Sequence, residues 1–289
     1  MNTKKIKALV GLLNEPNEAI YEYLQTEALK QGLQLVPFLE EASLQTTDMQ
    51  LQKRYANLIH QLQFNHIYTS LQTWKKNKTQ NLWDAYFLIT KYEYPSLEIE
   101  TVNAQLASLS TNLWMELSPD MTALEQMIVL KKIFFDKEKF TSDLEDPFGL
   151  TNMFLNTVLQ NRRGNDITLG IIFQCLAQKQ EIPLYGVNLP INYLLAYTQK
   201  SNRTQLSKIL FYINPYNKGV IFDLAELKKH LKESGMPISE NYLGLCTPED
   251  TILRLLYVLC RSYSIEHCQH KVSDIKRLIA IFDHPKEEL

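Results

Sequence analysis

The polar residues that could carry chemistry lie mostly in the second half of this 289-residue chain. Thr168, Asn192 and Asn214 fall at the starts or ends of predicted elements. A hydroxyl and two carboxamides can hydrogen-bond an extended peptide backbone, which would make a binding cleft. The same residue types are also common capping choices at helix and strand ends. The residues alone leave both interpretations open.

Sulfur and imidazole groups offer a second set of candidates. Cys175 lies on the apolar face of a predicted helix, which is typical of a core residue. The run His267, Cys268 and His270, with Cys260 one helix earlier, could be considered for zinc. Ligands this close together would crowd one side of the ion, and the spacing matches no common zinc site. We therefore expect a polar turn there, and neither a metal nor another cofactor.

Established catalytic and nucleotide-binding motifs are missing from the sequence. It contains no P-loop, dinucleotide-binding GxGxxG, HExxH, GxSxG or EF-hand loop. The four cysteines show no CxxC spacing, so a disulfide framework is not expected. The N-terminal lysines and short apolar stretch run into NEPNE without a small-residue cleavage site, so they do not indicate a signal peptide. We expect a cytoplasmic protein.

The composition indicates an ordinary globular protein that is rich in helix. Hydrophobic residues make up 45% of the chain and charged residues 21%, and nine glycines leave few flexible turns. Thirty basic residues against 32 acidic ones give a net charge of −2. Without a broad basic surface a nucleic-acid role is disfavoured. No apolar run is long enough to span a membrane.

Hydrophobic periodicity predicts the elements that must position these residues. The first 140 residues read as a helical array interrupted at NEPN, Pro95 and Pro119. A helix over 152–161 and a second one capped by Asp166 come next. Strands are predicted at 184–190, 193–198, 209–215 and 220–223, followed by helices at 223–233, 248–264 and 271–282. The fold class is mostly-α α+β, with a helical array (1–140), a core with a small antiparallel sheet (146–235) and a helical hairpin (246–289).

Several segments resemble a known family. RRGNDITLGIIFQCLAQKQEIPLYGVNLPINYLLAY, followed by FYINPYNKG, resembles the transglutaminase-like core of the bacterial SirB-type proteins. TPEDTILRLLYVLCRSY resembles the start of that family's tetratricopeptide-like hairpin. LLNEPNEAIYEYL and VPFLEEA resemble its HEAT-like entry region.

The resemblance implies a place for a catalytic triad. Active transglutaminase-like proteins use a Cys at a helix N-terminus, with a His and an Asp on neighbouring strands. The helix dipole and an imidazolium favour the thiolate, and the Asp orients the imidazole. Carried over by motif, the Cys position falls near Thr168, the His position on Asn192 and the Asp position on Asn214.

These replacements predict a protein that binds without cutting. A carboxamide cannot serve as a general base, and an unassisted hydroxyl is a poor nucleophile. The sequence thus favours a pseudoenzyme that acts as a scaffold or regulator for a protein or peptide partner, with Tyr193 and Tyr216 completing the binding set. The alternative is an amide hydrolase with relocated groups, using Cys175 or Thr168 with a histidine such as His230.

Overall fold

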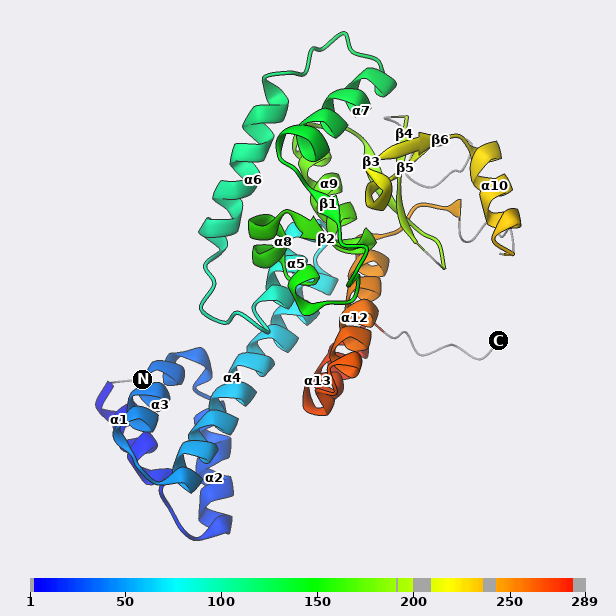
Figure 1. Ribbon diagram of the computed structural model, residues 1–289. Helices are drawn as coiled ribbons and strands as arrows, with labels where there is room; N and C mark the ends of the chain where they lie inside the picture. Colours follow the sequence, from blue (N-terminus) through cyan, green and yellow to red (C-terminus); the bar gives the residue numbers. More distant parts are fainter. Residues whose placement is uncertain (1–2, 191, 200–208, 236–242, 283–289) are drawn as a thin grey trace. The chain divides into compact units, whose positions relative to one another are not determined.

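The computed structural model describes residues 3–190, 192–199, 209–235 and 243–282 (Figure 1). The chain forms two compact units, Met1–Thr73 and Trp74–Leu289. Each unit is considered by itself. The three regions predicted from the sequence, with boundaries near 140 and 240, stay a prediction.

The first unit consists of short helices and most of one long helix. Its elements are α1 (Thr3–Leu12), α2 (Glu18–Leu29), the 3₁₀ turn η1 (Gly32–Leu35), α3 (Val36–Gln45) and α4 (Met49–Lys76), whose last residues belong to the second unit. Asn17 caps α2, and Pro37 lies in the first turn of α3. The core combines residues from all four helices, including Val10, Ala28, Leu39 and Leu58.

The second unit holds the remaining helices. These are α5 (Leu82–Thr90), α6 (Ile99–Trp114), α7 (Ala123–Lys131), the π-helical turn η2 (Lys132–Lys137), the 3₁₀ turn η3 (Leu150–Asn152), α8 (Leu155–Asn161), α9 (Asp166–Lys179), α10 (Leu224–Glu233), α12 (Pro248–Ile265) and α13 (Gln269–Ile279). The helical array predicted for the first 140 residues has no interruption after Pro119, whereas the backbone widens to a π-turn from Lys132. This turn buries three consecutive side chains, Ile133, Phe134 and Phe135. Phe134 stacks on Phe140 with ring centroids 4.1 Å apart.

A four-stranded antiparallel sheet lies in the second unit. Its strands are β3 (Leu184–Asn188), β4 (Tyr193–Thr198), β5 (Ile209–Asn214) and β6 (Val220–Phe222), in the order β3-β4-β5-β6. A pair of two-residue parallel strands, β1 (Thr141–Ser142) and β2 (Arg163–Gly164), forms separately. The 3₁₀ turn η5 (Pro215–Asn217) joins β5 to β6.

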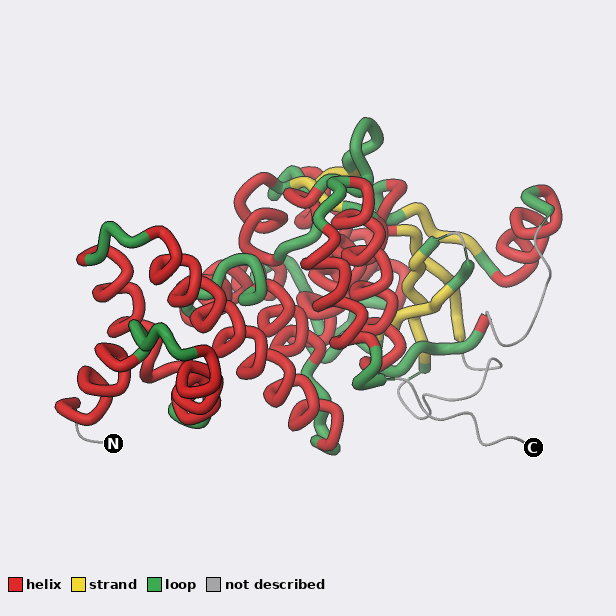
Figure 2. Tube along the Cα trace, turned by 90° about the horizontal axis from the view of Figure 1, so that it is seen from below, coloured by secondary structure: helices red, strands yellow, loops and turns green. Residues whose placement is uncertain are grey.

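The sheet is covered on both faces. All six residues of β4 are buried, which is typical of a strand covered on both sides. Leu227 and Leu231 of α10 pack with Leu194 and Ala196, while Tyr193 lies against Gly170 of α9. Figure 2 shows the strands between the main group of helices of the second unit and α10. These elements confirm the predicted mostly-α α+β fold.

The length and polarity of the helices show whether any of them could cross a membrane. Within the described residues, every helix is too short or too polar to cross a bilayer.

Candidate functional site

The N-terminus of α9 is the centre of the candidate site (Figure 1). Asn165 is its N-cap, because Asn165 Oδ1 accepts the backbone N–H of Thr168 at 3.0 Å. Asp166 is the first helical residue, so the prediction of Asp166 as the cap was wrong by one position. Asn165 and Thr168 form a reciprocal capping box, which satisfies two backbone donors at the helix start.

Thr168 is fully buried within that box. Its hydroxyl donates to Asn165 Oδ1 and accepts from the Asn165 N–H, both at 3.0 Å. Beside it lies Tyr86, whose pKa burial raises well above its ordinary value. The Thr168 proton is thus held by a carboxamide oxygen, which is no base, and its oxygen has no contact with solvent.

Asp166 is the first-turn residue of α9 that meets the start of β4. Its Oδ2 accepts the backbone N–H of Tyr193 at 2.7 Å and pairs with Arg254 Nη2 of α12 at 3.1 Å. Arg254 also donates to the carbonyl of Leu189 at 2.7 Å and to the side chain of Asn188. The side chains of Asp166 and Arg254 are only 18% and 14% exposed, so this ion pair is largely buried. It fastens α9, the β3–β4 connection and α12 together.

Asn192 and Asn214 lie at the same end of the sheet. Asn192 directly precedes β4, and Asn214 ends β5. The register, with Leu195 opposite Ile213, brings both carboxamides to that end. Asn214 Oδ1 caps η5 by accepting the N–H groups of Tyr216 at 3.0 Å and Asn217 at 3.2 Å.

Tyr216 lies next to Asn214 and ties this end of the sheet to residues 142 and 143. Its hydroxyl donates to the carbonyl of Asp143 at 3.1 Å, and its own carbonyl accepts from Ser142 Oγ. Burial raises the pKa of Tyr216, and the nearby carboxylates of Asp166 and Asp143 raise it further. The start of α9, the start of β4 and the β5–η5 junction therefore meet at one place.

Tyr193 points into the core instead. Its ring lies so close to Gly170 and Gly186 that a Cβ on either glycine would come within 2.6 Å of a ring carbon. Its hydroxyl donates to Gln174 Oε1 at 3.1 Å and lies 3.2 Å from Thr251 Oγ1. Burial raises the pKa of Tyr193 well above its ordinary value.

No thiol of the second unit hydrogen-bonds to an imidazole within the described residues. Burial raises the pKa of Cys175 and of Cys246 to about 12, which keeps both thiols protonated at neutral pH. The described histidines here, His230, His267 and His270, are all exposed. None of the three hydrogen-bonds to a thiol or a hydroxyl in the described part of the chain.

The histidine and cysteine run after α12 forms a turn. His267 adopts a left-handed conformation with φ of 56°, and Cys268 directly precedes α13. Among residues 3–190, 192–199, 209–235 and 243–282, no three His, Cys, Asp or Glu side chains are grouped so that they could hold a metal ion.

Sequence comparison now places the chain. A profile of the transglutaminase-like superfamily matches residues 100–257, more than half of its length. The chain belongs to the transglutaminase-like superfamily. The matched region runs from α6 into α12, so it contains both members of the Asp166–Arg254 pair and the ends of β4 and β5.

Individual relatives share parts of this transglutaminase-like chain. A UPF0162 protein of Pasteurella multocida is 31% identical over 129 residues, which cover 44% of this chain and 46% of the relative. A UPF0162 protein of Vibrio cholerae is 26% identical over 127 residues, covering 44% and 45%. Human F-box only protein 21 is 27% identical over 88 residues, covering 30% and 14%. The chain spans about half the length of the UPF0162 proteins it matches. No solved structure matches it significantly.

Sequence reasoning missed two members of this transglutaminase-like site. Asp166 was seen only as a cap, although an acidic residue in a first helical turn is also suited to pairing with a cation. Arg254 lies 88 positions further along the chain, and no local pattern links it to Asp166.

Proposed function

We propose that this transglutaminase-like protein is a SirB-type pseudoenzyme that binds a protein or peptide in the cytoplasm, as a scaffold or regulator, without amide chemistry. The observation that carries the proposal is the start of α9. There the residue facing β4 is Asp166, held by Arg254, and the motif position Thr168 is sealed in a capping box.

Nucleophilic catalysis needs a group that can be deprotonated next to a base. A thiolate at a helix N-terminus is stabilised by the helix dipole and a neighbouring imidazolium. At this helix start the acid Asp166 is paired with Arg254, and Thr168 donates its proton to an amide oxygen. The motif position for the base is Asn192, whose carboxamide does not take up a proton near neutral pH.

The same place keeps the capacity to bind a peptide backbone. Asn192 forms no side-chain hydrogen bond within the described residues, and Asn214 uses only its Oδ1, which leaves its Nδ2 donor available. Carboxamides pair with both the N–H and the carbonyl of an extended chain. Asn192, Asn214 and Tyr216 would contact the partner, while the buried Thr168 and Tyr193 would support them.

The alternative, a hydrolase with relocated groups, gains less support. With its pKa raised to about 12, the Cys175 thiol is a weak nucleophile at neutral pH. His230 is exposed on α10, whereas Thr168 is fully buried. A hydrolase of this kind would need these groups to come within hydrogen-bonding distance.

The absence of catalysis is tested with the purified full-length protein. Amide hydrolysis and incorporation of a fluorescent primary amine into casein are followed against a heat-inactivated sample. We expect no turnover above that control. Turnover that Thr168→Ala or Cys175→Ala abolishes would overturn the proposal.

Binding is tested with peptides selected from a random library against the full-length protein. Asn192→Phe places a bulky ring at the start of β4 and should weaken the selected peptides at least about tenfold, as expected for losing one or two well-placed hydrogen bonds. The matched control is the exposed Asn217, whose change to Ala should leave affinity unchanged. Equal affinities for Asn192→Phe and the wild type would contradict a cleft at this place.

A further inference from the structure

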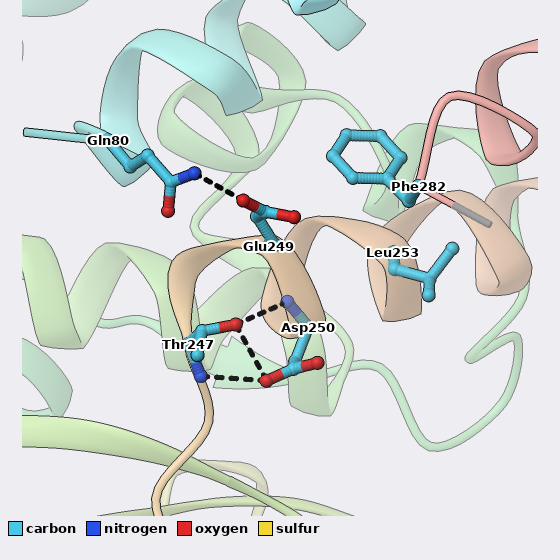
Figure 3. A pocket seen from close by; sticks show the side chains of 6 residues that line it. All are labelled: Gln80, Thr247, Glu249, Asp250, Leu253 and Phe282. Atoms are coloured by element: carbon cyan, nitrogen blue, oxygen red, sulfur yellow. Dashed lines mark hydrogen bonds between the residues drawn. The ribbon is translucent and has the colours of Figure 1, made fainter. Parts of the chain in front are cut away.

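A second site of different chemistry lies at the N-terminus of α12. A cavity of about 390 Å³ is lined by Gln80, Thr247, Glu249, Asp250, Leu253 and Phe282 (Figure 3). All six residues belong to the second unit. The cavity is separate from the Asp166 site, which uses Arg254 of the same helix.

The polar lining of this cavity consists of hydrogen-bond acceptors. Gln80 Nε2 donates to Glu249 Oε1 at 2.5 Å and to the Lys75 carbonyl at 2.9 Å, so both amide protons of Gln80 are used. The Thr247 hydroxyl donates to Asp250 Oδ2 at 2.7 Å. The second carboxylate oxygens of Glu249 and Asp250, and Gln80 Oε1, accept no hydrogen bond from the described residues. Figure 3 shows the second oxygen of Glu249 turned toward Phe282.

Apolar side chains form the other walls. Leu253 is half-buried on α12, one helical turn after Glu249, and Phe282 is buried with its ring edge-to-face on Trp74 at 6.4 Å. Thr247 and Asp250 at the rim are exposed. A ligand with a long apolar stem could lie along Leu253 and Phe282 while its backbone stays outside.

The charges around the cavity favour a cation. Two carboxylates, Glu249 and Asp250, line it. The Lys75 ammonium lies beside it, donates to the Ile281 carbonyl at 2.9 Å and lies 5.8 Å from the centroid of the Phe282 ring. Of the described residues named here, two are acidic and one is basic, and Lys75 is already directed at a carbonyl.

We propose that this cavity binds an arginine side chain of a partner protein or peptide. Arginine carries five donors and no acceptor, which matches a lining of carboxylate and amide oxygens. Its methylene stem matches the Leu253 and Phe282 walls. The inference rests on the proposed function only in that the arginine comes from a bound protein or peptide.

Nuclear magnetic resonance titration of the full-length protein tests this site directly. The probe is Nα-acetyl-arginine methylamide, and the matched control ligand is the citrulline analogue, a neutral isostere. We expect saturable shifts at amides 247–253 and at Phe282 with the arginine compound, and none at the same concentration of the citrulline compound. Equal shifts with both compounds, or none with arginine, would overturn the proposal. Tighter binding of the lysine analogue, or of unblocked arginine, would overturn the choice of a peptide arginine.

Two variants test whether the arginine compound binds in this cavity. Glu249→Gln keeps an acceptor for Gln80 but removes the charge, and it should weaken the arginine compound at least about tenfold, as for a lost hydrogen bond between charged groups. Glu266→Gln, an exposed change at the C-terminal end of the same helix, should have no effect. Equal affinity of Glu249→Gln and wild type would exclude the site. Asn192 plays no part in this assay. A negative result here would therefore refute the arginine site alone, while the Asn192→Phe measurement separately tests the proposed peptide cleft.

Discussion

Asp166 combines three interactions through one side chain at the start of α9. Its carboxylate interacts favourably with the helix dipole, accepts the Tyr193 N–H and pairs with Arg254. In an active transglutaminase-like protein a thiolate would need that same dipole and open space in front of it. Here the negative charge is already present, and the guanidinium of Arg254 offsets it. These three interactions fasten the start of α9 to β4 and α12.

Removing the cation of this pair should destabilise the protein strongly. Arg254→Met leaves the Asp166 carboxylate largely buried without its partner, which costs about 3 kcal/mol of unfolding free energy. The matched control is Lys229→Met, since the side chains of Lys229 and Glu233 are 78% and 63% exposed and lie 4.0 Å apart. An exposed pair of that kind contributes at most about 1 kcal/mol. Urea unfolding curves measure both, and similar losses for the two variants would contradict the assigned role of Asp166.

The reactivity of Cys175 separates the pseudoenzyme from the relocated hydrolase. Burial raises the pKa of this thiol to about 12, so at pH 8 only about one molecule in 10⁴ carries the thiolate. In a variant with Cys246, Cys260 and Cys268 changed to Ser, the remaining thiol should react with Ellman's reagent at least about 10³-fold more slowly than glutathione. Reaction as fast as glutathione would indicate an activated cysteine and favour the hydrolase.

At the scale of elements, the sequence predicted the helices and strands that are set by a local pattern of apolar residues. Short apolar runs predicted the strands at 193–198 and 220–223, and the structure has them at Tyr193–Thr198 and Val220–Phe222. The π-turn at Lys132 was missed because its cause is tertiary, namely the stacking of Phe134 on Phe140 and its edge-to-face contact with Phe173. β1 and β2 were missed because two residues carry no periodicity.

In the candidate site, too, the positions along the chain could be predicted from the sequence, whereas the side-chain contacts could not. The motif assigned candidate residues to the start of α9, the start of β4 and the end of β5, because those positions follow from sequence order. The residue at which the helix begins decides which side chain of its first turn faces β4. If the helix started one residue later, each side chain would be rotated by about 100° around the helix axis. Asn165 rather than Asp166 caps the helix, and this difference turns Asp166 toward Tyr193.

Two glycines set the distance between α9, β3 and the ring of Tyr193. A Cβ on Gly170 would lie 2.6 Å from one ring carbon, and one on Gly186 would lie 2.6 Å from another. Gly170→Ala and Gly186→Ala should each cost about 1–3 kcal/mol of unfolding free energy by overpacking. Gly11→Ala in α1 is the matched control, since nothing lies within 4 Å of its added Cβ and alanine favours a helix. Thermal or urea unfolding checks all three, and an unchanged stability of Gly186→Ala would contradict the close contact.

At the scale of the whole molecule, two thiols and a phenol with raised pKa values make the free energy of unfolding depend on pH in the alkaline range. Burial raises the pKa values of Cys175 and Cys246 from 9.0 to about 12, and that of Tyr212 from 10.0 to about 12. The folded state therefore holds protons that the unfolded state releases. The stability that depends on the two thiols is fully present below pH 9 and is lost progressively as the pH rises from 9 to 12.

This linkage predicts the size and origin of the alkaline loss. At pH 10, one unit above the unfolded pKa of each thiol, each should contribute a loss of about 1 kcal/mol, while Tyr212 contributes less because its unfolded pKa is higher. Urea unfolding at pH 8 and pH 10 measures the difference. The Cys175→Ala/Cys246→Ala variant should lose less stability over this interval than wild type, although it starts from a lower value because it removes buried atoms. Ser234→Ala, an exposed change that removes no thiol, carboxyl or phenol, is the control and should leave the pH dependence unchanged. If the double variant kept the full alkaline loss, the two thiols would not be the groups whose raised pKa values link stability to pH.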